Sequence, residues 1–170
     1  NMLCAATSSS LMGISDKHIA NVMKTFIGVE HRLENVAIIK DVTYINDSKA
    51  TNLDSVSVAI QSFNKPVVLI LGGRNKGADF RLLLPHIKSS HVRDIISYGE
   101  AGGQISTAIG DAVRSVQVTD LNSAVKTAQR LAAPGDVVLL SPGCASFDQF
   151  ANFEERGQYF KTKVMEMMAA

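Results

Sequence analysis

Residues 67–71 read Val-Val-Leu-Ile-Leu and decide the fold, because every position in this run is apolar. A strand that faces water on one side alternates apolar and polar residues, whereas a strand covered on both sides is apolar throughout. Parallel sheets with a helical layer on each face require strands of the second kind. The run therefore predicts the centre of a parallel sheet.

Three further runs are rich in apolar, β-branched residues, and stretches with helical spacing separate them. The four predicted strands are residues 66–71, 92–98, 113–118 and 137–140. This βαβα alternation predicts an α/β domain with an open, doubly wound, mostly parallel sheet. In such sheets ligands bind at the carboxyl ends of the strands, where loops lead into helix N-termini.

The chain before residue 46 follows other periods. Residues 1–12 suit a helix, and a second helix with one apolar face is predicted between Ser15 and Gly28. Apolar residues then alternate on either side of Lys40-Asp41, which predicts two short strands joined by a tight turn. Because the first helix begins without a capping residue, we interpret the helical pair as the remainder of an upstream domain.

The length and the charge narrow the possible classes of protein. A chain of 170 residues suits one main domain. A net charge of +1 is too balanced for the broad positive field that binding to nucleic acid or to an anionic membrane usually needs. The longest apolar run is far shorter than the ~20 residues that span a bilayer. We expect a cytoplasmic protein that binds neither nucleic acid nor membrane.

Cysteine and histidine spacing gives no sign of a metal site. Cys4 and Cys144 are far apart and form no CxxC pair, so a zinc site or a disulfide framework is not indicated. The histidines show no metal-ligand spacing either, and they are His18, His31, His86 and His91. We therefore predict no metal ligands in this chain and a reducing compartment.

Three loops at predicted strand ends carry unusual polar residues: 46–52, 72–79 and 141–148. Because they would share one edge of the sheet, they would bring together Lys49, Arg74, Lys76, Thr51 and Ser146. Such donors suit carboxylates or phosphates, and a small di-acid would fit. Each loop alone also fits ordinary turn chemistry, but the clustering of donors at the ligand-binding edge favours a site.

The glycine loop at 72–79 matches neither GxGxxG nor GxxxxGK[ST], because Gly77 is followed by Ala78. The chain thus lacks a phosphate-binding loop of its own, and it lacks the acidic residue that would hold the ribose of a nicotinamide cofactor. Two alternatives stay open on these residues: a Rossmann-type oxidoreductase or CoA-binding domain, and a non-enzymatic amino-acid sensor.

Five motifs, in order along nearly the whole chain, resemble the Mur ligases of bacterial cell-wall synthesis. They are HRLE (31–34), NDSKATN (46–52), LGGRNKGADF (71–80), PGDVVLLSPGCASFDQF (134–150) and NFEERG (152–157). Sister ligases typically carry an aromatic residue and a histidine in place of Ser48 and Lys49, so the DSKAT form resembles the members that add D-glutamate. The resemblance implies a Rossmann-like C-terminal, amino-acid-binding domain at 31–170, preceded at 1–30 by the last helices of a central ATP-binding domain.

Site residues follow from the resemblance, motif by motif. It implies that D-glutamate is surrounded by Lys49, Thr51, Lys76, Ser146, Phe147 and Phe153. It also implies ATP contacts from Asn1, Arg32 and Asp47, while His31 and Arg156 match family positions without a firm role. No residue is assigned to catalysis.

The resemblance implies an ATP-dependent ligase that converts UDP-N-acetylmuramoyl-L-alanine into an acyl phosphate, which the amine of D-glutamate then attacks. The phosphate-binding loop, most ligands of ATP and Mg²⁺, and a modified lysine belong to the family's central domain. We therefore expect the chain by itself to be inactive and monomeric.

Overall fold

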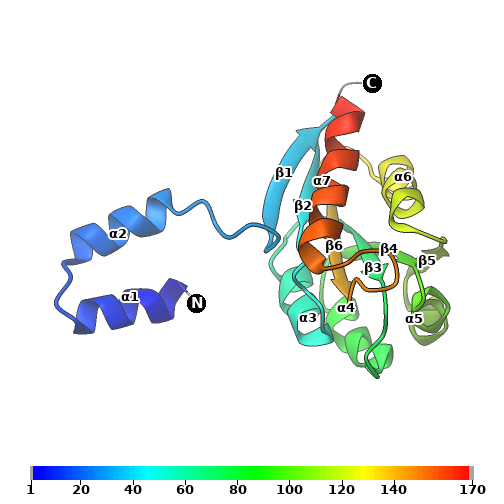
Figure 1. Ribbon diagram of the computed structural model, residues 1–170, viewed down its shortest axis with the longest axis horizontal. Coiled ribbons are helices and arrows are strands. Elements are labelled where there is room, and N and C mark those ends of the chain that lie inside the picture. Colours follow the sequence, from blue (N-terminus) through cyan, green and yellow to red (C-terminus); the bar gives the residue numbers. More distant parts are fainter. Residues whose placement is uncertain (1, 169–170) are drawn as a thin grey trace.

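The computed structural model describes residues 2–168 and contains a six-stranded sheet with the order β1-β2-β6-β3-β4-β5 (Figure 1). The strands are β1 (Glu34–Ile39), β2 (Val42–Asn46), β3 (Val67–Gly72), β4 (Val92–Tyr98), β5 (Arg114–Gln117) and β6 (Val137–Gly143). Neighbours from β2 to β5 run parallel, and β1 alone is antiparallel to its neighbour. The prediction of a mostly parallel α/β sheet is confirmed.

Helices cover both faces of this sheet. They are α3 (Leu53–Gln61), α4 (Leu84–Lys88), α5 (Gly102–Ile109), α6 (Leu121–Leu131) and α7 (Phe153–Met168), with short 3₁₀ turns η1 (Phe80–Leu83) and η2 (Gly110–Ala112). In β3, Leu69 packs into a core with α3, α4 and α5, while Val68 and Ile70 pack into a second core with α6 and α7. All of β3 is buried, as the apolar run at its centre predicts.

The β1-β2 hairpin turns at Lys40-Asp41, as predicted. Both residues have positive φ angles, 51° and 62°. Two such angles form the hairpin turn whose twist matches that of the flanking strands. The antiparallel pair therefore adds an edge to the parallel sheet without a helical crossover.

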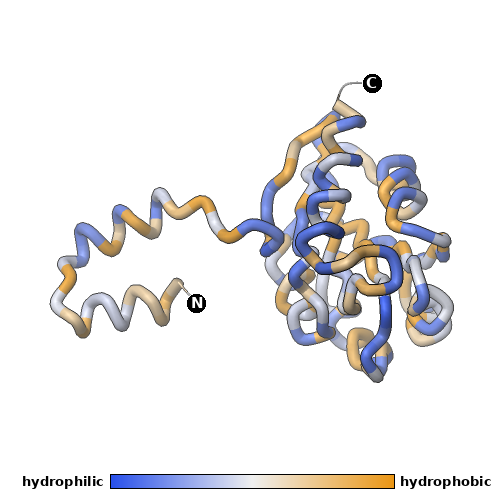
Figure 2. The backbone as a smooth tube through the Cα atoms, viewed as in Figure 1, coloured by the Kyte–Doolittle hydropathy of each residue, from blue (hydrophilic) through white to orange (hydrophobic). Residues whose placement is uncertain are grey.

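The N-terminal helices α1 (Met2–Leu11) and α2 (Asp16–Thr25) stand apart from the body of the molecule (Figure 1). Neither helix buries a residue. Figure 2 shows apolar and polar residues alternating along the two helices. Several of the apolar side chains there and in the following linker are exposed: Leu3, Leu11, Met12, Ile14, Val22, Phe26 and Ile27. No helix in the described part of the chain is long and apolar enough to cross a membrane.

The last residue of β3 fixes how closely that strand approaches β4. A Cβ atom at Gly72, which has φ +150°, would lie 2.2 Å from the Tyr98 carbonyl oxygen. Only glycine permits this backbone conformation and this contact together. Gly72 thereby sets where the loop after β3 leaves the sheet.

We predict that Gly72→Ala destabilises the chain by more than about 3 kcal/mol, because the methyl group displaces backbone rather than a flexible side chain. Gly77→Ala is the matched control, since Gly77 also has a positive φ (+88°) but meets nothing within 4 Å. The control should cost about 1–2 kcal/mol, the penalty of the left-handed conformation alone. Urea unfolding measures both, and equal losses would contradict the steric explanation.

Candidate functional site

Three loops leave neighbouring strands at one edge of the sheet, as predicted: loop A (residues 47–52) after β2, loop C (144–152) after β6 and loop B (73–79) after β3. Backbone hydrogen bonds join them. Arg74 N donates to the Ala145 carbonyl at 2.8 Å, and Ala145 N donates back at 3.1 Å. At the base of loop C, Gly143 N donates to the Ala50 carbonyl at 2.8 Å. The central loop C is therefore tied to loops A and B.

The guanidinium of Arg156, from the first turns of α7, lies completely buried beneath these loops. Its Nε and Nη2 donate to the Ser48 hydroxyl (3.0 Å) and carbonyl (2.8 Å), and its Nη1 donates to the Cys144 carbonyl at 3.0 Å. A Cβ at Gly73 would lie 3.3 Å from Nη1. One planar group thus hydrogen-bonds to loops A and C and leaves little room for a side chain at Gly73 of loop B.

Arg156 makes no ion pair with an acidic residue between residues 2 and 168; its partners are neutral oxygens. A buried charge is tolerated when its donors are all hydrogen-bonded, and the rigid fork of arginine suits several fixed acceptors at once. Ser48 continues the chain of contacts by donating to the Phe153 carbonyl at 2.8 Å. The role left open for Arg156 is therefore that of a positioning residue that fixes loops A and C.

Asp47 opens loop A and is 5% exposed. Its carboxylate accepts from the Ser141 hydroxyl at 2.8 Å and from Leu33 N at 3.2 Å. Burial raises the pKa of Asp47 to about 6, although both hydrogen bonds and the charge of Arg32 oppose this. Asp47 and Arg32 line a cavity of about 410 Å³ together with Lys49, Asp54 and Ser55. The two residues expected to contact ATP are thus brought together, whereas Asn1 lies outside the described residues.

Lys49 and Phe153, both expected at D-glutamate, come together across loops A and C. The Lys49 ammonium lies 4.8 Å from the centroid of the Phe153 ring. Lys49 N also donates to the His31 carbonyl at 3.0 Å, and the His31 ring meets Phe153 edge to face with centroids 6.1 Å apart. Lys49 therefore borders both the cavity and the Phe153 side of the edge.

The other residues expected at D-glutamate lie on the same edge. Lys76 is exposed on loop B, and its positive charge lowers the pKa of the Cys144 thiol in loop C against the larger effect of burial. Ser146 is buried, Thr51 half-buried, and Phe147 is 61% exposed. No described contact joins Lys76 to Lys49, so their sharing of one ligand stays a prediction.

Two details differ from the cationic crevice that the sequence suggested. Arg74 does not add a free charge, because its guanidinium pairs with Glu100 through two hydrogen bonds of 2.8 and 2.9 Å. Cys144 is 1% exposed, and burial raises the pKa of its thiol to about 12. A buried thiol in this state is unreactive.

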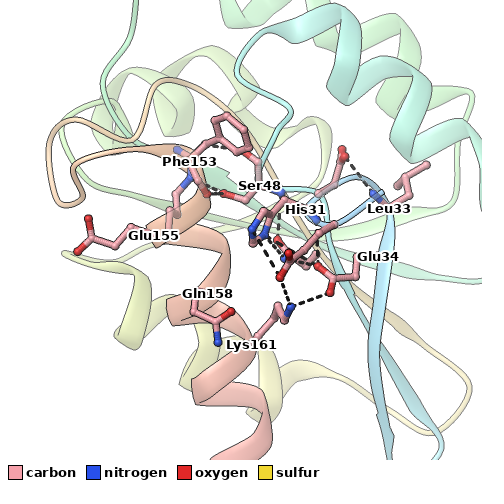
Figure 3. A network of polar contacts seen from close by, with 12 residues as sticks. His31, Leu33, Glu34, Ser48, Phe153, Glu155, Gln158 and Lys161 are labelled. Carbon is pink, nitrogen blue, oxygen red and sulfur yellow. Dashed lines mark hydrogen bonds and ion pairs between the residues drawn. The ribbon is translucent and has the colours of Figure 1, made fainter. Parts of the chain in front are cut away.

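A polar network underneath loop A connects it to the linker and α7 (Figure 3). His31 is buried, and its Nδ1 lies 2.9 Å from Asn46 Nδ2, which also donates to Glu34 at 2.9 Å. Lys161 reaches from α7 to Glu30 (2.7 Å) and Glu34 (2.8 Å). These contacts hold the segment that carries Arg32 against the body of the domain.

Sequence reasoning missed Asn46, Glu34 and Lys161. The signal for Asn46 was a polar residue ending an otherwise apolar strand, since a fully buried amide needs partners. Lys161 gave no signal, because the sequence does not distinguish a helical lysine that pairs with distant acidic residues from one that faces solvent. Glu30, His31 and Glu34 have ligand atoms within 4.8 Å of one another, but the Lys161 ammonium already bonds to both carboxylates.

Comparisons with known proteins agree with this architecture. Residues 31–144 match the family described as Mur ligase, glutamate ligase domain. The chain is 43% identical over 169 residues to the UDP-N-acetylmuramoylalanine–D-glutamate ligase of Salinibacter ruber. This match spans 99% of the chain and 36% of the relative. The ligase of the same name from Lactobacillus delbrueckii subsp. bulgaricus is 46% identical over 169 residues, with 98% and 36% covered.

Solved structures show the same fold. UDP-N-acetylmuramate-alanine ligase MurC from Thermotoga maritima matches with a TM-score of 0.73 at 13% identity, over 99% of this chain and 36% of that chain. E. coli FolC in complex with DHPP and ADP matches with a TM-score of 0.60 at 18% identity, over 92% of this chain and 35% of that chain. At such low identities these likenesses establish the fold alone.

We predict that Arg156→Met destabilises the chain by about 3–5 kcal/mol, because it leaves the Ser48 and Cys144 carbonyls buried without a donor. Arg156→Lys should cost less but still lose part of the stability, because one ammonium cannot reproduce the fork. Arg81→Met serves as control, since Arg81 pairs with Asp79 in solvent. Urea unfolding measures all three, and a loss below about 1 kcal/mol for Arg156→Met would refute the positioning role.

We predict that Asp47 makes the stability of the chain depend on pH. Because its folded-state pKa of about 6 lies above that of the unfolded chain, its contribution to stability falls as pH rises from about 4 to about 6. Asp47→Asn removes this titration. The free energy of unfolding of the variant, relative to that of the wild type, should therefore rise by about 2–3 kcal/mol as pH increases from about 4 to about 6. Urea unfolding across the range measures the difference. A ¹³C titration of the carboxyl with an ordinary midpoint near 4 would contradict the prediction.

Proposed function

The chain belongs to the Mur ligase family through its glutamate ligase domain, and from this premise we propose that it supplies the D-glutamate-binding domain of an ATP-dependent ligase. The chain spans 36% of the length of the curated relatives it matches. The ligase as a whole would join D-glutamate to UDP-N-acetylmuramoyl-L-alanine. The names of the relatives at 43% and 46% identity support this choice within the family.

The observation that carries the proposal is the placement of Lys49 and Lys76. They stand on loops A and B of one sheet edge, and neither pairs with an acidic residue in the described range. A dicarboxylic amino acid offers two anionic groups that two such ammonium groups would neutralise. Thr51 and Ser146 would add hydroxyl donors, and Phe153 and Phe147 would border the apolar part of the ligand.

The cavity of about 410 Å³ beside Arg32 and Asp47 supports a neighbouring nucleotide site. In this proposal the guanidinium of Arg32 pairs with phosphate oxygens, and the Asp47 carboxylate accepts from ribose hydroxyls. Asn1 would contact the adenine. Lys49 lines this cavity and also lies over the Phe153 ring, which supports an amino-acid site next to the nucleotide site.

The helical pair supports a division of the chain into two parts. Helices α1 and α2 bury no residue and expose an apolar surface. We assign residues 1–30 to the end of the central ATP-binding domain, whose remaining surface would cover them, and residues 31–170 to the C-terminal domain. Within the described residues, the Glu30–His31–Glu34 cluster does not fit Mg²⁺, because the Lys161 ammonium already bonds to both carboxylates. We assign the ligands of Mg²⁺ to the central domain, as the family resemblance implies.

The physical task of this domain is to orient the D-glutamate amine. The relevant reaction is attack of the amine on an acyl phosphate of the UDP-linked substrate, followed by release of phosphate. Holding both carboxylates while the amine points outward converts a bimolecular encounter into a positioned one. Closure of the domain over the central domain would then complete the site. In the cell we place this ligase in the cytoplasm, as a monomer.

We predict that Lys76→Ala, made in the ligase that contains this chain, raises the KM for D-glutamate about 10- to 100-fold, with little change for ATP. The estimate corresponds to the loss of one charge-assisted hydrogen bond. Steady-state kinetics with each substrate varied in turn measures both constants. Lys65→Ala is the control, because Lys65 is an exposed lysine that precedes β3 at the far edge of the sheet.

Equal changes in both KM values would refute the assignment of Lys76 to D-glutamate. A thermal-shift comparison of the chain with D-glutamate, NAD and CoA tests the wider alternative. Stabilisation by NAD or CoA alone would favour a nucleotide-binding domain of another class and overturn the proposed function.

A further inference from the structure

A second cavity, of about 470 Å³, lies at the opposite edge of the sheet from loops A, B and C. The start of β2, the hairpin turn, the last part of α6 and the loop after α6 form its walls. Its lining includes Ile39, Val42, Ala132 and Pro134, which give it an apolar floor. A cavity of this size lies within the range of small-molecule sites.

Three cationic side chains line this cavity: Lys40 from the hairpin turn, and Lys126 and Arg130 from α6. All three are exposed, and none forms an ion pair with an acidic residue that the structure describes. Lys126 and Arg130 are four residues apart, so they share one face of the helix. Like charges gathered in this way repel one another unless an anion lies between them.

Among residues 2–168, no acidic side chain lines the cavity. Of the nearby acids, Asp136 is buried and already pairs with Arg93 at 3.0 Å, and its Oδ2 accepts from Ala133 N at 2.7 Å. Asp41 lies in the hairpin turn beside Lys40, and its side chain forms no ion pair in the described range. The positive charge of the cavity is therefore not neutralised by its walls.

Tyr44 contributes a polar donor to the same cavity. Its side chain is 2% exposed, and burial raises the pKa of its phenol. The Tyr44 hydroxyl makes no hydrogen bond to a described residue. Tyr44 lines the cavity, so a ligand there would lie beside this side chain.

The frame of this cavity is fixed in the fold. Gly135 N donates to the Asp41 carbonyl at 2.8 Å, and Thr43 N donates to the Asp136 carbonyl at 2.9 Å. These bonds connect the hairpin to the loop after α6. A preformed site loses less conformational entropy when a ligand binds.

We propose that this cavity binds a small dianionic phosphate monoester with an apolar or aromatic body. Lys40, Lys126 and Arg130 surround the phosphate, the Tyr44 hydroxyl donates to a phosphate oxygen, and the apolar floor covers the body. Three cations match a dianion better than a single carboxylate. The site lies away from loops A, B and C, and it is independent of the proposed D-glutamate function.

The test is a titration of the 170-residue chain with phenyl phosphate, followed through backbone amide resonances. We expect saturable shifts confined to residues 39–44 and 126–134, with a dissociation constant at least about tenfold lower than for inorganic phosphate or for benzyl alcohol. The two comparison ligands separate the contribution of the phosphate from that of the body. No saturation by 10 mM, taken as a rough practical ceiling for specific sites of this kind, overturns the proposal.

Matched variants complete the test. The double variant Lys126→Gln, Arg130→Gln should weaken phenyl phosphate binding by at least about tenfold, and Tyr44→Phe by about three- to tenfold. The double variant Lys65→Gln, Lys88→Gln removes two other exposed lysines and should leave the constant unchanged. Equal weakening by both double variants would show a general charge effect and overturn the site. Addition of D-glutamate should leave the phenyl phosphate shifts in place, since the two ligands bind at opposite edges.

Discussion

The buried guanidinium of Arg156 is the interaction on which the rest of this edge depends. Its hydrogen bonds reach Ser48 in loop A and Cys144 in loop C, and it lies against Gly73 in loop B. A sheet fixes where strands end, but it does not fix the loops that follow them. A single rigid donor group with acceptors on separate loops supplies that constraint. Lysine offers the same charge without the planar geometry.

The sequence predicted the architecture well because apolar periodicity reports burial directly. The burial of β3 and the hairpin turn at Lys40-Asp41 both follow from local apolar periodicity, whereas the positive φ angles of the two turn residues did not follow from their types. Side-chain partners were less predictable. Arg74 looked like a free cation, but Glu100, which pairs with it, lies 26 residues later and only the fold brings them together. Lys161 likewise acquires its role from the packing of α7 against the linker, which no local pattern records.

The linker after α2 is fastened at several points, and this has consequences for movement. His31 contacts Asn46 and Phe153, while Lys161 bonds to Glu30 and Glu34. These contacts hold the chain to the domain from residue 30 onward, so a movement of the helical pair relative to the domain would pivot in the exposed stretch 26–29. Arg32 would then move with the C-terminal domain and not with the helices. On the proposed function, domain closure carries Arg32 and Asp47 to the nucleotide as one unit.

Lys49 occupies the boundary between the two proposed ligands. Its ammonium lies over the Phe153 ring, its side chain lines the cavity of Asp47 and Arg32, and its backbone N–H donates to His31. This backbone hydrogen bond ties the linker at His31 directly to the lysine that the proposed function assigns to the amino acid. Since Ser48, the preceding residue, is held by Arg156, Lys49 has little backbone freedom of its own. If the two proposed ligands bind as inferred, Lys49 and its fixed backbone are the structural link between the nucleotide side and the amino-acid side of this edge.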